Sequence, residues 1–295
     1  MTRYIFHTLD VFTNQIFGGN PLAVFPEAEG LSSQQMQAIA QELNLSETVF
    51  VLPSENEVCD FKLRIFTPRA EIPFAGHPTV GTAYLLAYLG KVLPLKHIIN
   101  LEEGVGTIPV ALHWFDKQIQ TTALQAAQLP AFSVSPSLDI ANLLSLEAND
   151  LADNLDAAVI SCGLPFFYIP LTTKEAVDNC ALNMTLWQKE LAQSDSQNIY
   201  IFTVEKNEIY ARMFAPGLGI TEDPATGSAA TSLAGYLHKY IDSETSEQTW
   251  QITQGIKMGR SSELLLTFKL ENKQISMISV GGSSVLVSCG EMNVC

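Results

Sequence analysis

Three polar side chains stand in segments whose composition suits proton chemistry: Glu47, His77 and Asp223. Glu47 follows a helical pattern and precedes an apolar strand, within the run LNLSETVFV at residues 43–51. Burial of a carboxyl group disfavours its charged form, which is how such a group becomes a proton carrier near neutral pH. An ordinary solvated loop glutamate is the structural alternative, and the local residues leave both interpretations open.

His77 and Asp223 each stand directly before a proline, in two loops that resemble each other at residues 73–81 and 221–228. An imidazole and a carboxylate in such positions can orient a substrate or exchange protons with it. Asp before Pro is also a good helix N-cap, and a lone histidine is commonly a packed core or surface residue. Because His is a poor cap, His77 is the harder of the two to explain by structure alone.

Glycine and amide residues near these loops suggest how a ligand could be held. Gly81 and Gly227 follow the two prolines at the same distance, although glycine weakens a helix. Bare backbone at a helix N-terminus can bind an anion, and it can equally let the helix pack against a neighbouring strand. Asn20, in the turn at residues 18–21, could hydrogen-bond a substrate or simply form the turn.

Strand-like runs rich in β-branched and aromatic residues dominate the chain, and helical patterns are fewer. The helix expected over residues 32–44 opens with Ser32 and Gln35, which is a capping-box arrangement. Residues 78–89 and 224–240 form two further helical patterns that are apolar on nearly all sides. Because an all-apolar helix belongs inside a protein, we expect two separate cores, each with a helix enclosed by sheet.

The chain also resembles itself. Three blocks recur in the same order at nearly one offset, and they are residues 19–26 with 163–170, 60–68 with 208–216, and 78–83 with 224–229. The pattern predicts a duplicated domain of about 146 residues. Two similar halves would form a cleft, and clefts between domains are preferred ligand sites.

Composition excludes several classes of function. The 295 residues include 31 Asp and Glu against 16 Lys and Arg, and a net charge of −15 would repel nucleic acid and anionic membranes. The first residues lack a signal-peptide pattern. The most apolar stretch of the sequence is too interrupted to span a membrane. The cysteines have no CxxC spacing, which suggests reduced thiols. We therefore expect a cytoplasmic protein with no membrane or nucleic-acid partner. The histidines lack metal-ligand spacing, so no metal site is expected.

The motifs around these residues resemble those of the PhzF-like phenazine-biosynthesis family. The matching blocks are DVFT at residue 10, GNPLAV at 19, NLSETVF at 44, RIFTP at 64, FAGHPTVGTA at 74, MFAP at 213 and EDPATGSA at 222. They keep the expected order along the chain, and the chain length also fits. The resemblance covers essentially the whole sequence.

The resemblance implies the diaminopimelate-epimerase fold. This is an α/β (α+β) architecture of two pseudo-symmetric domains, each a barrel-like, mostly antiparallel sheet around a central helix. The N-terminal domain would span residues 1–118 and take back a final strand near 284–295. The C-terminal domain would span residues 119–283, with the active site in the cleft between them. Members of the family are typically homodimers.

The resemblance further implies a cofactor-independent isomerase that acts on a small, amino-acid-like carboxylate. Glu47 matches the family's acid/base glutamate, and His77 and Asp223 match the polar residues of its two loops. Further positions of the same motifs would bind the substrate: Asn20, Ser46, Gly76, Gly81, Thr226, Gly227 and Ser228. The reaction best known for the family is a hydrogen shift on a hydroxylated cyclohexadiene amino acid.

Two alternatives from other classes stay open. One is a binding protein of the same fold without turnover. The other is a thiol-dependent epimerase or racemase, which would need one cysteine in each paired loop. Ala75 and Pro224 stand nearest those places, so the missing cysteine pair disfavours the thiol mechanism.

Overall fold

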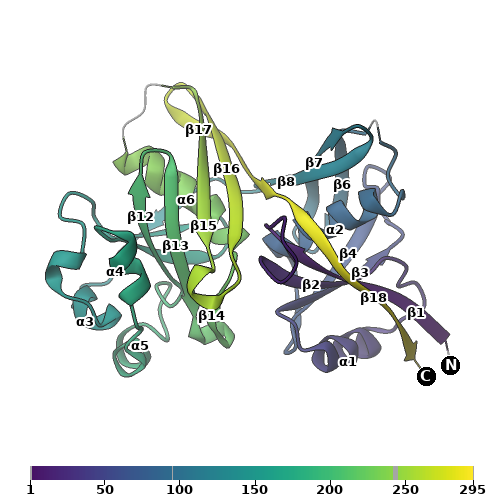
Figure 1. The fold of residues 1–295 in the computed structure, drawn as a ribbon, viewed down its shortest axis with the longest axis horizontal. Coiled ribbons are helices and arrows are strands. Elements are labelled where there is room, and N and C mark those ends of the chain that lie inside the picture. Colours follow the sequence, from purple (N-terminus) through teal and green to yellow (C-terminus); the bar gives the residue numbers. More distant parts are fainter. Residues whose placement is uncertain (1, 95, 242–244, 295) are drawn as a thin grey trace. The chain divides into compact units, whose positions relative to one another are not determined.

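The computed structural model describes residues 2–94, 96–241 and 245–294 (Figure 1). These residues form eighteen β-strands, six α-helices and three short 3-10 helices. The prediction of a mixed α+β fold dominated by sheet is confirmed. The chain divides into two compact units, of which unit 1 is Met1–Gln125 with Gly281–Cys295 and unit 2 is Ala126–Val280.

Unit 1 places most of its chain in strands around one buried helix. Its helices are α1 (Ser33–Leu43) and α2 (Gly76–Tyr88). Its strands are β1 (Thr2–Val11), β2 (Asn20–Phe25), β3 (Glu47–Leu52), β4 (Phe61–Phe66), β5 (Glu71–Ile72), β6 (Ile98–Glu103), β7 (Gly106–Phe115), β8 (Gln118–Gln125) and β18 (Ser284–Val294). Figure 1 shows β1 and β18 side by side, so the two ends of the chain meet in one antiparallel ladder.

Most ladders among the described residues of unit 1 are antiparallel, and two are parallel. β2 pairs with β3 and β4 pairs with β6 in parallel, whereas β1–β2, β3–β4, β6–β7 and β7–β8 are antiparallel. Helix α2 contacts β1, β2, β3, β7 and β8. A Cβ atom on Gly81 would lie 2.5 Å from the Val11 side chain and 2.7 Å from that of Leu22, so only glycine lets α2 pack this closely.

Unit 2 contains the remaining elements. Its helices are α3 (Ile140–Leu144), α4 (Lys174–Asn179), α5 (Met184–Glu190) and α6 (Gly227–Tyr240), with 3-10 helices η1 (Ala148–Asp150), η2 (Pro216–Leu218) and η3 (Ile256–Met258). Its strands are β9 (Ala131–Ser133), β10 (Ala158–Ser161), β11 (Pro165–Pro170), β12 (Ile199–Glu205), β13 (Glu208–Ala215), β14 (Ile220–Asp223), β15 (Glu247–Gln254), β16 (Ser262–Glu271) and β17 (Gln274–Gly282), whose last two residues belong to unit 1.

The ladder order of unit 2 repeats that of unit 1. The pairs β10–β11, β12–β13, β13–β14 and β15–β16 are antiparallel, and β11–β12 and β13–β15 are parallel. Helix α6 contacts β10, β11 and β16. Its Tyr236 ring packs edge-on against Phe202 and at a tilt against Tyr168. Each unit thus buries its own apolar helix against its own strands.

The first predicted helix agrees with the structure down to its cap. In α1 the Ser32 hydroxyl accepts from the Gln35 backbone, and the Gln35 side chain accepts from the Ser32 backbone. The other two helices begin elsewhere than predicted, α2 at Gly76 and α6 at Gly227. Asp223 is therefore not a helix N-cap, because its backbone pairs with Met213 in the β13–β14 ladder instead.

The unit boundaries follow the strands. β8 pairs with β7 along its length, and this places the change of unit after Gln125, a few residues beyond the position expected from the sequence. The chain re-enters unit 1 at Gly281, just before β18. Cys295 lies outside the described residues. Among the helices that the structure describes, none is both long and apolar enough to cross a membrane.

Candidate active site

Glu47 is the first residue of β3 and is only 9% exposed. The chain leaves α1 through Asn44, whose left-handed backbone ends that helix, and enters β3 two residues after Leu45. Parallel pairing of Glu47 with Leu22 then fixes the carboxyl group beside the start of β2. The solvated-loop interpretation of this glutamate is wrong, because the strand begins at the glutamate itself.

His77, the second residue of α2, faces Glu47. Its Nε2 atom lies 3.3 Å from Glu47 Oε2, and the histidine is 6% exposed. Its ring also hydrogen-bonds the carbonyl oxygen of Pro21. Burial lowers the pKa of His77 to about 3. The imidazole is therefore neutral at physiological pH.

The tautomer of that neutral ring follows from its partners. The Pro21 carbonyl can only accept a hydrogen bond, and His77 Nε2 forms none of good geometry within the described residues. The ring N–H therefore stands at Nδ1, and Nε2 presents a lone pair to Glu47. The lowered pKa of the buried ring disfavours transfer of a proton from the Glu47 carboxyl group to His77.

The turn before β2 places the next predicted residue. Asn20 is fully buried and pairs with Val11 across the β1–β2 ladder. Gly19 has φ +58°, and a Cβ atom there would lie 2.3 Å from the Val11 carbonyl oxygen, so the turn requires glycine. The Asp10 carboxylate accepts a 2.6 Å hydrogen bond from the Phe17 backbone and so holds the same turn.

The remaining predicted residues of unit 1 take structural positions whose binding role stays a prediction. Ser46 is half-buried in the bend between α1 and β3, and Gly76 is the buried first residue of α2. Of the two explanations offered for Gly81, close packing is realised, because its bare backbone faces β1 and β2. Anion binding at that glycine stays a prediction.

Asp223 closes β14 in unit 2 and is buried. Thr226, the residue before α6, donates a 2.5 Å hydrogen bond from its hydroxyl to Asp223 Oδ2. Gln254, at the end of β15, donates from its amide to the Asp223 carbonyl at 2.8 Å and to the Thr226 hydroxyl at 3.0 Å. Gly227 and Ser228 follow as the first residues of α6. These bonds fix the Asp223 carboxylate in one orientation.

Sequence reasoning missed the ion pair that Arg212 forms with Glu222, the residue before Asp223. Arg212 donates from Nε and Nη2 to both carboxylate oxygens of Glu222, each at 2.9 Å. Its Nη1 donates to the carbonyl oxygens of Val177 and Cys180, at 3.0 and 2.8 Å. The signal was present, because Arg212 matches Arg64 of the first copy in the repeat.

The described cysteines are free thiols in the structure: Cys59, Cys162, Cys180 and Cys289. Burial raises the pKa of both Cys162 and Cys180 to about 12. These two thiols are protonated at neutral pH and are therefore poor nucleophiles and bases. Among the residues that the structure describes, no three His, Cys, Asp or Glu side chains gather as metal ligands would.

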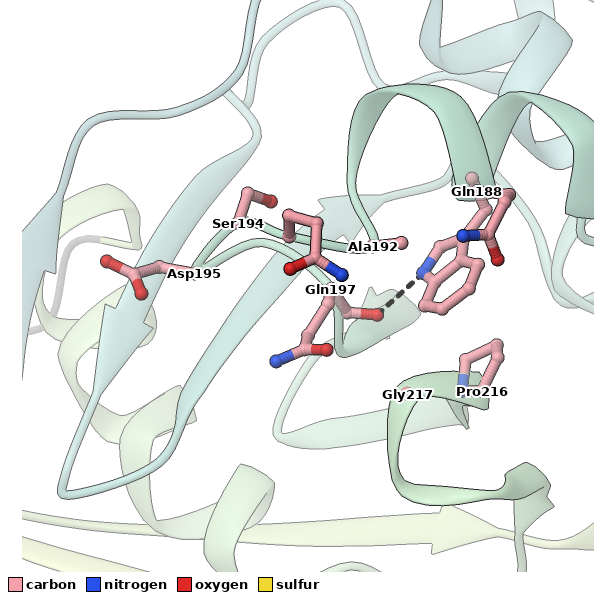
Figure 2. Close-up of a pocket in the computed structure, with 9 residues that line it drawn as sticks. Gln188, Ala192, Ser194, Asp195, Gln197, Pro216 and Gly217 are labelled. Atoms are coloured by element: carbon pink, nitrogen blue, oxygen red, sulfur yellow. Dashed lines mark hydrogen bonds between the residues drawn. The ribbon is translucent and has the colours of Figure 1, made fainter.

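A separate hollow of about 600 Å³ lies in unit 2, and Figure 2 shows its polar walls. The lining residues are Trp187, Gln188, Ala192, Gln193, Ser194, Asp195, Gln197, Pro216 and Gly217. The Trp187 indole N–H donates to the Gln197 carbonyl at 2.9 Å, which ties two of its walls together. None of the predicted site residues lines this hollow.

Comparison with known proteins decides the family. The model of phenazine biosynthesis-like (PhzC-PhzF) proteins matches residues 9–290. The chain belongs to this family. An uncharacterized isomerase of Pasteurella multocida is 36% identical over all of this chain and 96% of its own. The trans-2,3-dihydro-3-hydroxyanthranilate isomerase of Pseudomonas chlororaphis is 33% identical over 96% of each chain.

Solved structures agree with the family assignment. A PhzF-family phenazine biosynthesis protein of Bacillus anthracis superposes with a TM-score of 0.90 at 25% identity, over 100% of both chains. The resemblance noted in the motifs is thereby confirmed for the family and for its fold. The compared relatives are named isomerases, which gives the Glu47–His77 contact a chemical context.

Proposed function

We propose that this chain is a cofactor-independent isomerase that moves a proton on a small, amino-acid-like carboxylate, with Glu47 as the acid/base. The observation that carries the proposal is the buried contact between the Glu47 carboxyl group and a neutral His77 imidazole. A carboxyl group shielded from water and beside a hydrogen-bond acceptor is suited to hold and release a proton. Membership in a family with named isomerases supports the same reaction class.

The reaction conserves atoms and electrons. Glu47 takes a proton from one carbon, the bonding electrons move into the conjugated system of the substrate, and the same proton is delivered to another carbon. His77 stays neutral throughout, so the proton remains on Glu47 between the two transfers and is not trapped on the ring. One carrier therefore performs both steps.

Asp223 enters the proposal through its motif and its rigid setting. A carboxylate held by the Thr226 hydroxyl is suited to bind an ammonium or hydroxyl group of a substrate. Asn20, Ser46 and Ser228 supply further polar groups in the family motifs.

Solvent exchange tests the proposal directly. Wild type is incubated in deuterated water with trans-2,3-dihydro-3-hydroxyanthranilate, the substrate named for the Pseudomonas relatives, and with a panel of amino acids. We expect isomerised product for at least one probe, with deuterium at carbon in those turnovers in which the proton on Glu47 exchanges with solvent before it is redelivered. Binding of a probe without exchange or product would instead support a binding protein without turnover and would overturn the proposal.

A further inference from the structure

We propose that Glu103 is a positioning residue that works as a protonated carboxylic acid, donating to Thr79 and so bracing the first turn of α2 beneath His77. Glu103 is the last residue of β6, and Thr79 lies two residues after His77 in the helix. The effect on catalysis rests on the function proposed above. The protonation of Glu103 does not, and it can be measured without any substrate.

Hydrogen counting at Thr79 relates its two short contacts to the protonation of Glu103. The Thr79 hydroxyl oxygen lies 2.7 Å from the Ala75 carbonyl oxygen and 2.7 Å from Glu103 Oε1. A hydroxyl group has one hydrogen, and a carbonyl oxygen can only accept. If Thr79 donates to Ala75, the second short contact needs a hydrogen from Glu103. Both bonds are therefore satisfied together only when Glu103 carries a proton.

The surroundings of Glu103 favour the same state. It is 6% exposed, and its Oε2 atom is buried without a hydrogen-bond partner among the described residues. An ionised carboxylate left so poorly solvated would be costly, whereas the carbonyl oxygen of an acid costs much less. Burial accordingly raises the pKa of Glu103 to about 8.

The cations on β4 do not compensate a negative charge on Glu103, because each is already paired with another carboxylate. Lys62 forms ion pairs with Glu55 and Glu102, and Arg64 is paired with Glu71.

Within the part of the chain that the structure describes, α2 and β7 carry no compensating cation either. On α2 the titratable groups are the neutral His77 and the tyrosines Tyr84 and Tyr88. On β7 the one titratable side chain is His113, exposed toward the far end of the strand.

In unit 2 a glutamine amide, not a carboxyl group, hydrogen-bonds the threonine hydroxyl near the start of the buried helix. Gln254 ends β15 and donates to the Thr226 hydroxyl, which in turn donates to the Asp223 carboxylate. Glu103 ends β6, the strand that pairs in parallel with β4 as β15 does with β13. An amide always has hydrogens to donate, whereas a carboxyl group has one only when protonated. The Glu103–Thr79 bond of unit 1 is therefore sensitive to pH.

The sign of the pH effect follows from the raised pKa. The folded protein binds the Glu103 proton more tightly than the unfolded chain, whose carboxyl group has the ordinary pKa of 4.5. The stabilisation is fully present below that value and is lost as pH rises through about 8. Stability and the placement of His77 should therefore both decline on the alkaline side.

Three variants test the proposal. Glu103→Gln keeps a hydrogen-bond donor that cannot ionise, as Gln254 does in unit 2. Glu103→Met removes the donor at similar side-chain volume. Glu102→Gln removes the neighbouring carboxylate and serves as the matched control. The first readout is the infrared carbonyl band of protonated carboxyl groups. We expect Glu103→Gln to remove one such band at neutral pH and Glu102→Gln to leave it unchanged.

The second readout is the unfolding midpoint as a function of pH. Wild type and Glu102→Gln should lose stability between pH 5 and 9 relative to Glu103→Gln. Equal pH dependence in wild type and Glu103→Gln, or an unchanged infrared band, would overturn the proposal whether or not the enzyme is active.

The third readout is the deuterium exchange rate. Glu103→Met should lower kcat roughly tenfold at every pH, and Glu103→Gln should restore it and remove the alkaline decline. Wild-type kcat in Glu103→Met would overturn the positioning role. Inactive wild type with the expected infrared and stability results would overturn only the proposed function.

Discussion

Near the start of each buried helix, a threonine hydroxyl takes part in a similar hydrogen-bonding scheme, and the scheme ends on different groups in the two units. In unit 1 the scheme joins the Thr79 hydroxyl to the Ala75 carbonyl oxygen and to Glu103 Oε1, each at 2.7 Å. In unit 2 it runs from Gln254 through Thr226 to the Asp223 carboxylate. The unit 1 scheme ends on backbone and leaves His77 facing Glu47, whereas the unit 2 scheme fixes an anion.

The difference indicates that the two similar units can have different roles. Unit 1 holds a carboxyl group beside a neutral imidazole, an arrangement that can carry a proton. Unit 2 holds a carboxylate that already accepts a hydroxyl hydrogen bond, an arrangement suited to binding. Proton transfer should therefore depend mainly on unit 1 and substrate affinity mainly on unit 2.

Glu47→Gln and Asp223→Asn should separate these two roles, and they carry the largest expected effect. Glu47→Gln should lower kcat by about a thousandfold, because it removes the proton carrier while preserving shape. Asp223→Asn should act mainly on KM. Steady-state kinetics measures both parameters, and Glu42→Gln, which changes an exposed glutamate at the end of α1, is the control. A kcat for Glu47→Gln equal to wild type would reverse the assignment.

The ion pairs Arg212–Glu222 and Arg64–Glu71 allow the two units to be compared in their contribution to the free energy of unfolding. Arg212 and Glu222 are mostly buried, whereas the Glu71 side chain that pairs with Arg64 is 43% exposed. Arg212→Met should lower the free energy of unfolding by about 3 kcal/mol, because it leaves a buried carboxylate and two carbonyl groups without donors. Arg64→Met should cost under about 1 kcal/mol. Chemical denaturation measures both, and equal losses would contradict the proposed difference.

Gln254→Leu tests the hydrogen bonds that fix Asp223. The variant leaves the Asp223 carbonyl and the Thr226 hydroxyl without their donor. We expect a loss of about 2 kcal/mol in unfolding free energy and a higher KM. Gln251→Leu, an exposed position of the same strand, serves as the control. An unchanged KM in a folded Gln254→Leu protein would show that Asp223 needs no such support.

Alkylation of the cysteine thiols is the treatment with the smallest expected effect on the exchange rate. Burial holds Cys162 and Cys180 in the protonated form, so iodoacetamide should leave the exchange rate unchanged. Rapid inactivation that substrate prevents would point instead to the thiol mechanism.

Local features of the fold could be predicted from sequence, and features set by distant pairing could not. The α1 capping box was predictable because Ser32 and Gln35 are three residues apart. The predicted start of α6 was wrong because Asp223 pairs within the β13–β14 ladder. This pairing overrides the preference of an Asp-Pro pair to begin a helix.

The same distinction holds for the candidate site. Glu47, His77 and Asp223 stood out because their motifs are compact and repeated. The Glu103–Thr79 contact spans 24 residues of sequence, and an acidic residue at a strand end is normally solvated. The hydrogen bonds of Asp10 and Arg212 likewise form only in the folded chain, although the repeat itself sets Arg212 against Arg64.

The state of the His77 ring tests the central claim most directly, because the proton can stay on Glu47 only if the imidazole is neutral. Nitrogen NMR of protein labelled at histidine, with His77→Asn to assign the signal, reports the charge and tautomer of the ring. We predict a neutral ring protonated at Nδ1 throughout pH 5 to 8. A His77 signal that titrates to imidazolium near its ordinary pKa of 6.5 would contradict the account.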